Sequence, residues 1–218
     1  GNPPYVKASD ARKEYTVRNY NTARCPDIYA WVMERAATLA SKQGAYGMIV
    51  PLSLTFSGNF QSLRKLLLDK FTASWFSSFA RIPAALFSAE VRVRNTIYIG
   101  LRSGDTGHHT TITHRWFEAA RPHLVERIEY ARFDKGLWDG LVPKIGNQRF
   151  LSALESAKAA IPPIDAKIAS RATAHQLHFK KSAYNWVSFG FTPAPAYDNL
   201  GGELPVTESG ITSFDSRD

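Results

Sequence analysis

The sequence predicts an α/β fold, in which part of an open sheet is followed by a mixed α+β segment. Across residues 1–102, helical periodicity alternates with short apolar runs in the order helix, strand, helix, strand, strand. A flexible connection, Ser103-Gly104-Asp105-Thr106-Gly107, then separates this part from the rest. Aromatic and alternating residues in 174–191 favour strands there. We therefore expect one domain over residues 1–102 and a second over 103–218.

A helix is predicted over residues 26–43, because Pro26 suits a first helical position and Gly44 can end the helix. Residues 46–50 form a short apolar run that ends at Pro51, as a buried strand would. Ser57 is expected to cap a second helix. The apolar faces predicted for the two helices are Ile28, Trp31, Val32 and Leu39, and then Phe60, Leu63, Leu67 and Phe71.

Two further strands are predicted, over residues 74–79 and 93–101, with the break at Arg81-Ile82-Pro83 and a loop between them. Residues 115–133 are expected to be helical with a break at Pro122, and residues 147–160 to form another helix. The tail from Thr192 is rich in Pro, Gly and Ser and is expected to be a loop.

The charge balance favours a polyanionic partner, since 27 Lys+Arg against 19 Asp+Glu give a net charge of +8. The single cysteine, Cys25, cannot form an internal disulfide and fits a reducing cytoplasm. No signal peptide opens the chain, and its most apolar stretch, 84–101, carries charges that exclude a membrane span. A cytoplasmic protein without a membrane partner is therefore expected.

The tetrapeptide Asn2-Pro3-Pro4-Tyr5 suits the methylation of a conjugated amine. The exocyclic nitrogen of adenine is a poor nucleophile until two acceptors engage its hydrogens and draw it toward a tetrahedral geometry. The Asn2 carboxamide and a backbone carbonyl fixed by Pro3 and Pro4 offer two such acceptors. Tyr5 could stack on a base that has left the duplex. The alternative is a proline-rich turn with a surface tyrosine.

The order of segments after this tetrapeptide resembles the adenine-specific DNA methyltransferases of restriction–modification systems over residues 1–102. The resemblance implies a partial Rossmann-like sheet of the S-adenosylmethionine-dependent kind, whose last strand runs antiparallel beside the strand before it. It also implies that Asn2 and the Pro3 carbonyl hold the amine, and that Phe87 closes the base pocket opposite Tyr5. The alternative for Phe87 is a loop aromatic packed in the core. The segments that carry the resemblance are Asp27-Ile28-Tyr29-Ala30, Gly47-Met48-Ile49-Val50-Pro51, Leu63-Arg64-Lys65-Leu66-Leu67, Ile82-Pro83, Leu86-Phe87 and Val93-Arg94-Asn95-Thr96-Ile97-Tyr98-Ile99-Gly100.

In this family the glycine-rich loop for S-adenosylmethionine and the acidic residue for its ribose precede the tetrapeptide, so both are expected upstream of Gly1. Downstream, Phe189-Gly190-Phe191 and Gly201-Gly202 are better interpreted as turns. We therefore expect this chain alone to bind the cofactor weakly. The resemblance makes double-stranded DNA the partner, with residues 103–218 as a target-recognition segment, and a restriction endonuclease domain or subunit as a second partner.

Four basic residues are predicted to contact DNA: Arg92, Arg94, Lys180 and Lys181. Arg92 and Arg94 would share one face of a strand, and the two lysines lie among aromatic residues. A merely solvated face is the alternative for both pairs. His108, His109 and His114 lie in a polar segment without a ligand spacing typical of zinc, so no metal is expected.

The function that these patterns favour is methylation of a flipped-out adenine in DNA by an enzyme fragment that is inactive when isolated. The same tetrapeptide occurs in methyltransferases that act on the amide of glutamine. Those chains usually end soon after the last strand, whereas more than a hundred residues follow Gly100 here. A DNA-binding module that has lost catalysis, and adenine methylation in RNA, stay open as further alternatives.

Overall fold

The computed structural model of the chain describes residues 1–14, 16–87, 93–160, 175–181 and 187–193, with side chains described only up to residue 160. The chain divides into two compact units, Gly1–Ser156 and Ala157–Asp218.

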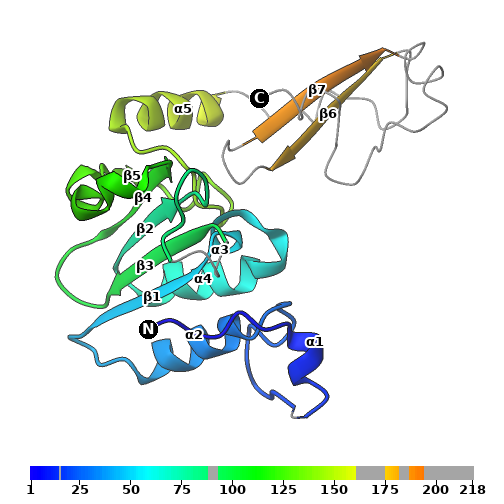
Figure 1. Cartoon of the computed structure of the whole chain (residues 1–218), viewed down its shortest axis with the longest axis vertical. Coiled ribbons are helices and arrows are strands. Elements are labelled where there is room, and N and C mark those ends of the chain that lie inside the picture. The colour runs from blue at the N-terminus through cyan, green and yellow to red at the C-terminus, as the bar shows by residue number, and fades with distance from the viewer. Residues whose placement is uncertain (15, 88–92, 161–174, 182–186, 194–218) are drawn as a thin grey trace. The chain divides into compact units, whose positions relative to one another are not determined.

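The first unit is built on a mixed sheet of five strands in the order β1-β3-β2-β4-β5 (Figure 1). Strand β3 runs antiparallel to both of its neighbours, β2 and β4 run parallel, and β5 is antiparallel to β4. The strands are β1 (Ala45–Pro51), β2 (Ala73–Phe79), β3 (Asn95–Leu101), β4 (Gly107–His114) and β5 (Ala131–Phe133). The α/β class is thereby confirmed, as is the prediction that the last of the three expected strands, β3, runs antiparallel beside the strand before it, β2. The position of β3 between β1 and β2 was not predicted.

The helices of this unit are short, and the bounds of the first predicted helix were too wide. Residues 6–8 and 26–28 pair with each other instead, since Ala8 N donates to Pro26 O and Ile28 N to Val6 O. The helix can therefore begin only at Tyr29. The helical segments are α1 (Ala8–Ala11), α2 (Tyr29–Leu39), α3 (Ser53–Phe56), α4 (Gln61–Lys70) and α5 (Gln148–Ala160), with 3-10 turns η1 (Gly58–Phe60), η2 (Glu118–His123) and η3 (Val125–Arg127).

Two other helix predictions need correction. Ser57 precedes η1 without a side-chain capping bond, and its carbonyl instead accepts a hydrogen bond from Arg64 Nη1 at 2.6 Å. Residues 115–133 hold η2, η3 and β5 in place of a long helix. The helix predicted over 147–160 is confirmed as α5.

The face of α2 that packs inward differs from the predicted one. Trp31 is buried, as expected, but Val32 and Leu39 are 38% and 68% exposed. The residues that α2 buries against α4 and β1 are Tyr29, Ala30, Trp31, Met33, Glu34 and Ala37. Apolar residues occur almost all round this helix, so the periodicity marked two stripes and the sequence could not say which one faces the sheet.

Aromatic side chains fill the core beneath β1, β3 and β2. Tyr46 stacks on Phe71 with ring centroids 5.2 Å apart, and the Phe76 ring lies 4.9 Å from that of Tyr98. A smaller cluster of Phe79, Ala84, Trp116 and Leu124 packs the connection after β2 against the η2 and η3 segment.

The second unit contains an antiparallel pair, β6 (His175–Lys181) and β7 (Val187–Pro193). The prediction of strands in residues 174–191 is confirmed. Phe189-Gly190-Phe191 was wrongly predicted to be a turn, because Gly190 lies within β7 in register with His178. Gly201-Gly202 lies outside the described residues. Among those that are described, no helix has the length and apolar character required to cross a bilayer.

Candidate functional site

The loop Asn2–Tyr5 is anchored on the edge strand β1. The backbone nitrogen of Gly1 donates to Gly47 O at 2.7 Å, and Ile49 N donates back to Gly1 O at 2.9 Å. Pro3 is buried, whereas Asn2 is exposed. The loop is therefore fixed through its backbone while the Asn2 carboxamide stays accessible to a ligand.

The strand directions bring the ends of β1 and β2 and the start of β3 together near the Asn2–Tyr5 loop. Because β1 and β2 both run antiparallel to β3, their carboxyl ends meet the start of β3 at one edge of the sheet. Asn95, the first residue of β3, is in register with both Pro51 and Phe79. Open α/β sheets bind ligands at the carboxyl ends of their parallel strands, so this edge is the natural place for a site.

The hydroxyl of Tyr5 lies at the centre of a hydrogen-bonded group at this edge. It is 2.9 Å from Asn2 Oδ1, 3.1 Å from Ile49 O and 3.3 Å from Asn95 Nδ2. Burial raises the pKa of the Tyr5 phenol, against a lowering by the Asn95 hydrogen bond, so the phenol keeps its proton. The sequence suggested a stacking role for the Tyr5 ring and none for its hydroxyl, and Asn95 was not predicted as a site residue.

The Tyr5 ring is supported by the start of α2. It meets the Tyr29 ring edge-on, with centroids 6.4 Å apart and an interplanar angle of 80°. Tyr29 is itself stacked on Phe60 at 4.9 Å. A row of aromatic rings therefore links the loop to the core.

Phe87 lies in the connection between β2 and β3, which starts and ends at the same edge of the sheet. It is half-buried. The residues before it are held firmly, because Arg121 donates to Ala85 O and Leu86 O at 3.1 and 2.9 Å. This geometry is compatible both with a pocket wall and with a core aromatic, so both interpretations of Phe87 stay open.

Of the four predicted DNA contacts, only Arg94 has a described side chain. It is half-buried and precedes β3, and its carbonyl accepts from Leu52 N at 2.8 Å. The strand begins two residues later than predicted, so strand alternation does not fix the direction of Arg94. Arg92 lies outside the described residues, and Lys180 and Lys181 belong to β6, whose side chains are not described.

The three histidines of the polar segment lie on β4, a strand that was not predicted. His108 is 7% exposed, and its burial lowers its pKa to about 4. His109 stacks on Trp75 with centroids 5.2 Å apart. Within the part of the chain that the structure describes, no three His, Cys, Asp or Glu side chains lie close enough together to hold a metal ion.

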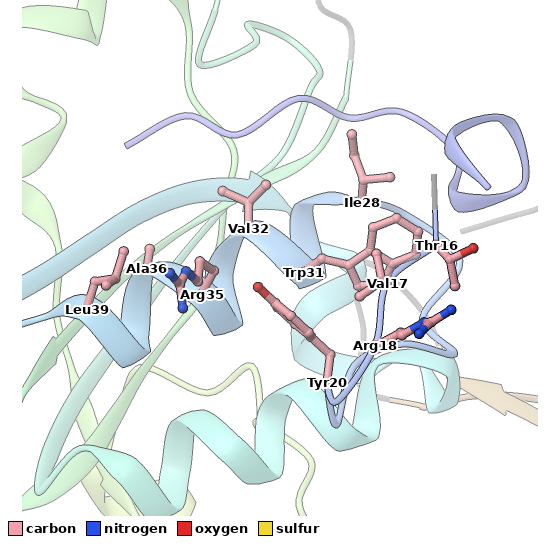
Figure 2. A pocket seen from close by; sticks show the side chains of 10 residues that line it. All are labelled: Thr16, Val17, Arg18, Tyr20, Ile28, Trp31, Val32, Arg35, Ala36 and Leu39. Carbon is pink, nitrogen blue, oxygen red and sulfur yellow. The ribbon is translucent and has the colours of Figure 1, made fainter. Parts of the chain in front are cut away.

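A hollow of about 480 Å³ lies beside α2, close to where Ile28 bonds to Val6 (Figure 2). Its lining includes Trp31, Val32 and Leu39 but no acidic side chain. An S-adenosylmethionine site needs an acidic group for the ribose hydroxyls and a glycine-rich turn. This hollow therefore does not fit the cofactor, although it accounts for the two apolar residues of α2 that the core leaves exposed.

Residues 1–82 match the family model of the Eco57I restriction-modification methylase. The match spans the Asn2–Tyr5 loop, α2, β1, α4 and β2 and ends before β3. The beginning of the chain is thus similar to restriction–modification methylases. No curated protein matches the chain.

Three solved structures are distantly similar. The protein in a DrdV–DNA complex is 18% identical with a TM-score of 0.46, and the match covers 62% of this chain and 17% of the DrdV chain. A nuclease-deletion mutant of the Type ISP restriction-modification enzyme LlaGI, in complex with a DNA substrate mimic, is 16% identical with a TM-score of 0.44. The match covers 70% of this chain and 18% of the LlaGI chain. A structure of a type I restriction–modification system is 15% identical with a TM-score of 0.35, and the match covers 88% of this chain and 35% of the other chain. The chain spans less than a fifth of the first two.

Proposed function

We propose that this chain carries the amine-binding half of a DNA adenine methyltransferase. The observation that carries the proposal is the Asn2-Pro3-Pro4-Tyr5 loop at the carboxyl edge of a sheet whose strand β3 is reversed. The family match includes this loop, which supports a methylase role for it.

In the proposed mechanism, Asn2 Oδ1 and the Pro3 carbonyl accept hydrogen bonds from the two N–H groups of the adenine amine. Their hold on the hydrogens strengthens as the nitrogen becomes tetrahedral, so it stabilises the transition state more than the bound base. The Tyr5 ring stacks on the flipped base and replaces the stacking lost in the duplex, and Phe87 closes the other side.

S-adenosylmethionine would supply the methyl group. The hollow beside α2 does not fit this cofactor, because no acidic side chain lines it. We propose that this chain alone does not bind the cofactor tightly. A cytoplasmic location is part of the same proposal.

Duplex DNA is the proposed substrate, and the net charge of +8 favours it. Residues 103–218 would supply target recognition, with Arg92, Arg94, Lys180 and Lys181 on the phosphate backbone. A restriction endonuclease domain or subunit is the second proposed partner.

The test is Asn2→Ala in the full-length enzyme, assayed for methyl transfer to DNA and for DNA binding. Turnover should fall about a hundredfold or more, because one transition-state acceptor is lost, while DNA affinity changes little. Asn59→Ala, at an exposed asparagine of η1, is the matched control and should leave both quantities unchanged. Near-normal turnover in Asn2→Ala would remove the basis of the proposal. Methyl transfer to glutamine of a protein, with none to DNA, would favour the amide-methylating class.

A further inference from the structure

We propose that Asn95 is a positioning residue for the reaction, which acts through the Tyr5 hydroxyl to hold the Asn2 carboxamide in its reactive orientation. The inference rests on the proposed function and adds two groups to it: a buried carboxamide and a phenol hydroxyl that the stacking role does not use.

The directions of the hydrogen bonds follow from the chemistry of the groups. A carboxamide nitrogen donates and cannot accept, so Asn95 Nδ2 donates to Tyr5 Oη across 3.3 Å. The phenol has one proton, and Tyr5 must therefore donate to Asn2 Oδ1 at 2.9 Å or to Ile49 O at 3.1 Å. The Asn2 oxygen is the closer acceptor. A relay thus runs from Asn95 through Tyr5 to Asn2.

The relay keeps the oxygen of the exposed Asn2 carboxamide, and not its nitrogen, in the position that accepts from the amine. A carboxamide can turn over, and the reversed Asn2 would offer N–H donors to an amine that also donates. The Tyr5 proton engages one lone pair of Asn2 Oδ1 and keeps this oxygen in place. The second lone pair stays available for the adenine amine.

Asn95 is suited to anchor such a relay because it is rigid. It is 1% exposed and begins β3 between β1 and β2, where Pro51 and Phe79 are its register partners. In the described residues its Oδ1 has no hydrogen-bond partner, although a buried carboxamide normally satisfies both ends. Its Nδ2 bonds to Tyr5, which is the one hydrogen bond given for this carboxamide among the described residues. Groups that lock a reactive side chain in this way are typical supports of an active site.

The test is a double-mutant cycle in the full-length enzyme with Tyr5→Phe and Asn95→Asp. Tyr5→Phe keeps the ring but removes the hydroxyl. Asn95→Asp keeps the shape but replaces the donor by an acceptor, which draws the Tyr5 proton away from Asn2. Each change should lower kcat about tenfold, as expected when one hydrogen bond is removed, and leave KM for DNA within about twofold. The double variant should be no slower than the slower single one, because both changes break the same relay.

Two further measurements separate positioning from simple destabilisation. Capture of a fluorescent base analogue at the target position should persist in both variants, since stacking needs only the Tyr5 ring. Tyr46→Phe removes a hydroxyl that donates to Met33 O in the core, and this matched control should keep full turnover.

Full turnover in Tyr5→Phe would overturn the relay. If Asn95→Asp does not fold, the turnover of Tyr5→Phe is by itself the test of the relay. Wild-type turnover in Asn95→Asp, or losses that multiply in the double variant, would overturn it as well. The parallel Asn2→Ala assay separates the two proposals: loss of turnover there, with full turnover in Tyr5→Phe, contradicts the relay and leaves the proposed function standing.

Discussion

The Asn2 carboxamide lies at the surface, yet its oxygen is within hydrogen-bonding distance of the Tyr5 hydroxyl. From the sequence, the residue types of this loop were enough to suggest acceptors for an amine. The partners of these residues were out of reach, because Asn95 lies ninety residues further along the chain than Tyr5. The available signal was an asparagine at the start of an apolar strand, since a buried carboxamide requires a partner.

His108 predicts a loss of stability in acid. Its pKa in the fold is about 4, below the ordinary 6.5, so between these values the unfolded chain binds a proton that the folded chain refuses. The free energy of unfolding should therefore fall as the pH is lowered from about 6.5 toward 4. Burial also lowers the pKa of His109 and His114, which adds in the same direction.

Urea denaturation at pH 7 and pH 5 measures this effect. His108→Gln cannot take up the proton and should lose less stability between the two pH values than the unmodified chain. Equal pH dependence in His108→Gln and the unmodified chain would show that His108 does not cause the loss.

At the scale of elements, the bounds of β1 and β2 were predicted more closely than those of α2. The predictions over 46–50 and 74–79 gave β1 and β2 to within one residue at each end, because both segments hold aromatic or β-branched residues that favour strands. The inward face of α2 was not predictable, since its Val32 and Leu39 are as apolar as the residues that the core takes. Residues 115–133 have spacing typical of a helix, but Pro122 and packing against Phe79 produce short turns instead.

Arg64 joins three elements and should be essential for their arrangement. It is 1% exposed and donates to the carbonyls of Leu54, Ser57 and Gly140 at 2.6–2.9 Å, and its burial lowers its pKa to about 10. Arg64→Leu removes the donors to one buried and two partly buried carbonyls and should cost about 3–5 kcal/mol in the free energy of unfolding.

Urea titration checks this cost. Arg64→Lys should not restore the stability, because an ammonium group lacks the planar fork that reaches all three carbonyls. Lys65→Leu, at the exposed neighbouring position, should change stability by less than about 0.5 kcal/mol. A cost below about 1 kcal/mol for Arg64→Leu would mean that these carbonyls find other donors.

At the scale of the whole molecule, the antiparallel direction of β3 beside β2 was predictable through the family resemblance, whereas its position between β1 and β2 was not. Strand β4 was not, because Gly107–His114 is polar and rich in Thr and His and has no apolar run. It pairs with β2 through backbone hydrogen bonds, which leave no mark in the sequence. Residues 107–133 therefore extend the sheet beyond the predicted boundary at residue 102, and the functional division at that boundary stays a prediction.

The net charge of +8 predicts DNA binding that weakens with salt, since each neutralised phosphate releases counterions. Lys180→Ala with Lys181→Ala should lower the slope of log affinity against log salt by about one unit for each phosphate that the protein no longer neutralises. The exposed lysines Lys42 and Lys65, changed together to Ala, are the control pair and should leave the slope unaltered. The same slope in both double variants would assign Lys180 and Lys181 to a surface that DNA does not touch.

The central claim is that this loop serves the methylation of adenine in DNA, and the methylated product tests it most directly. Duplex DNA incubated with the full-length enzyme and isotope-labelled S-adenosylmethionine would be digested to nucleosides and resolved by mass spectrometry. We predict that the label appears in N6-methyldeoxyadenosine with the wild type, and that Asn2→Ala reduces this signal about a hundredfold or more. Label in another nucleoside, in protein glutamine alone, or at an undiminished level in Asn2→Ala would contradict the assignment.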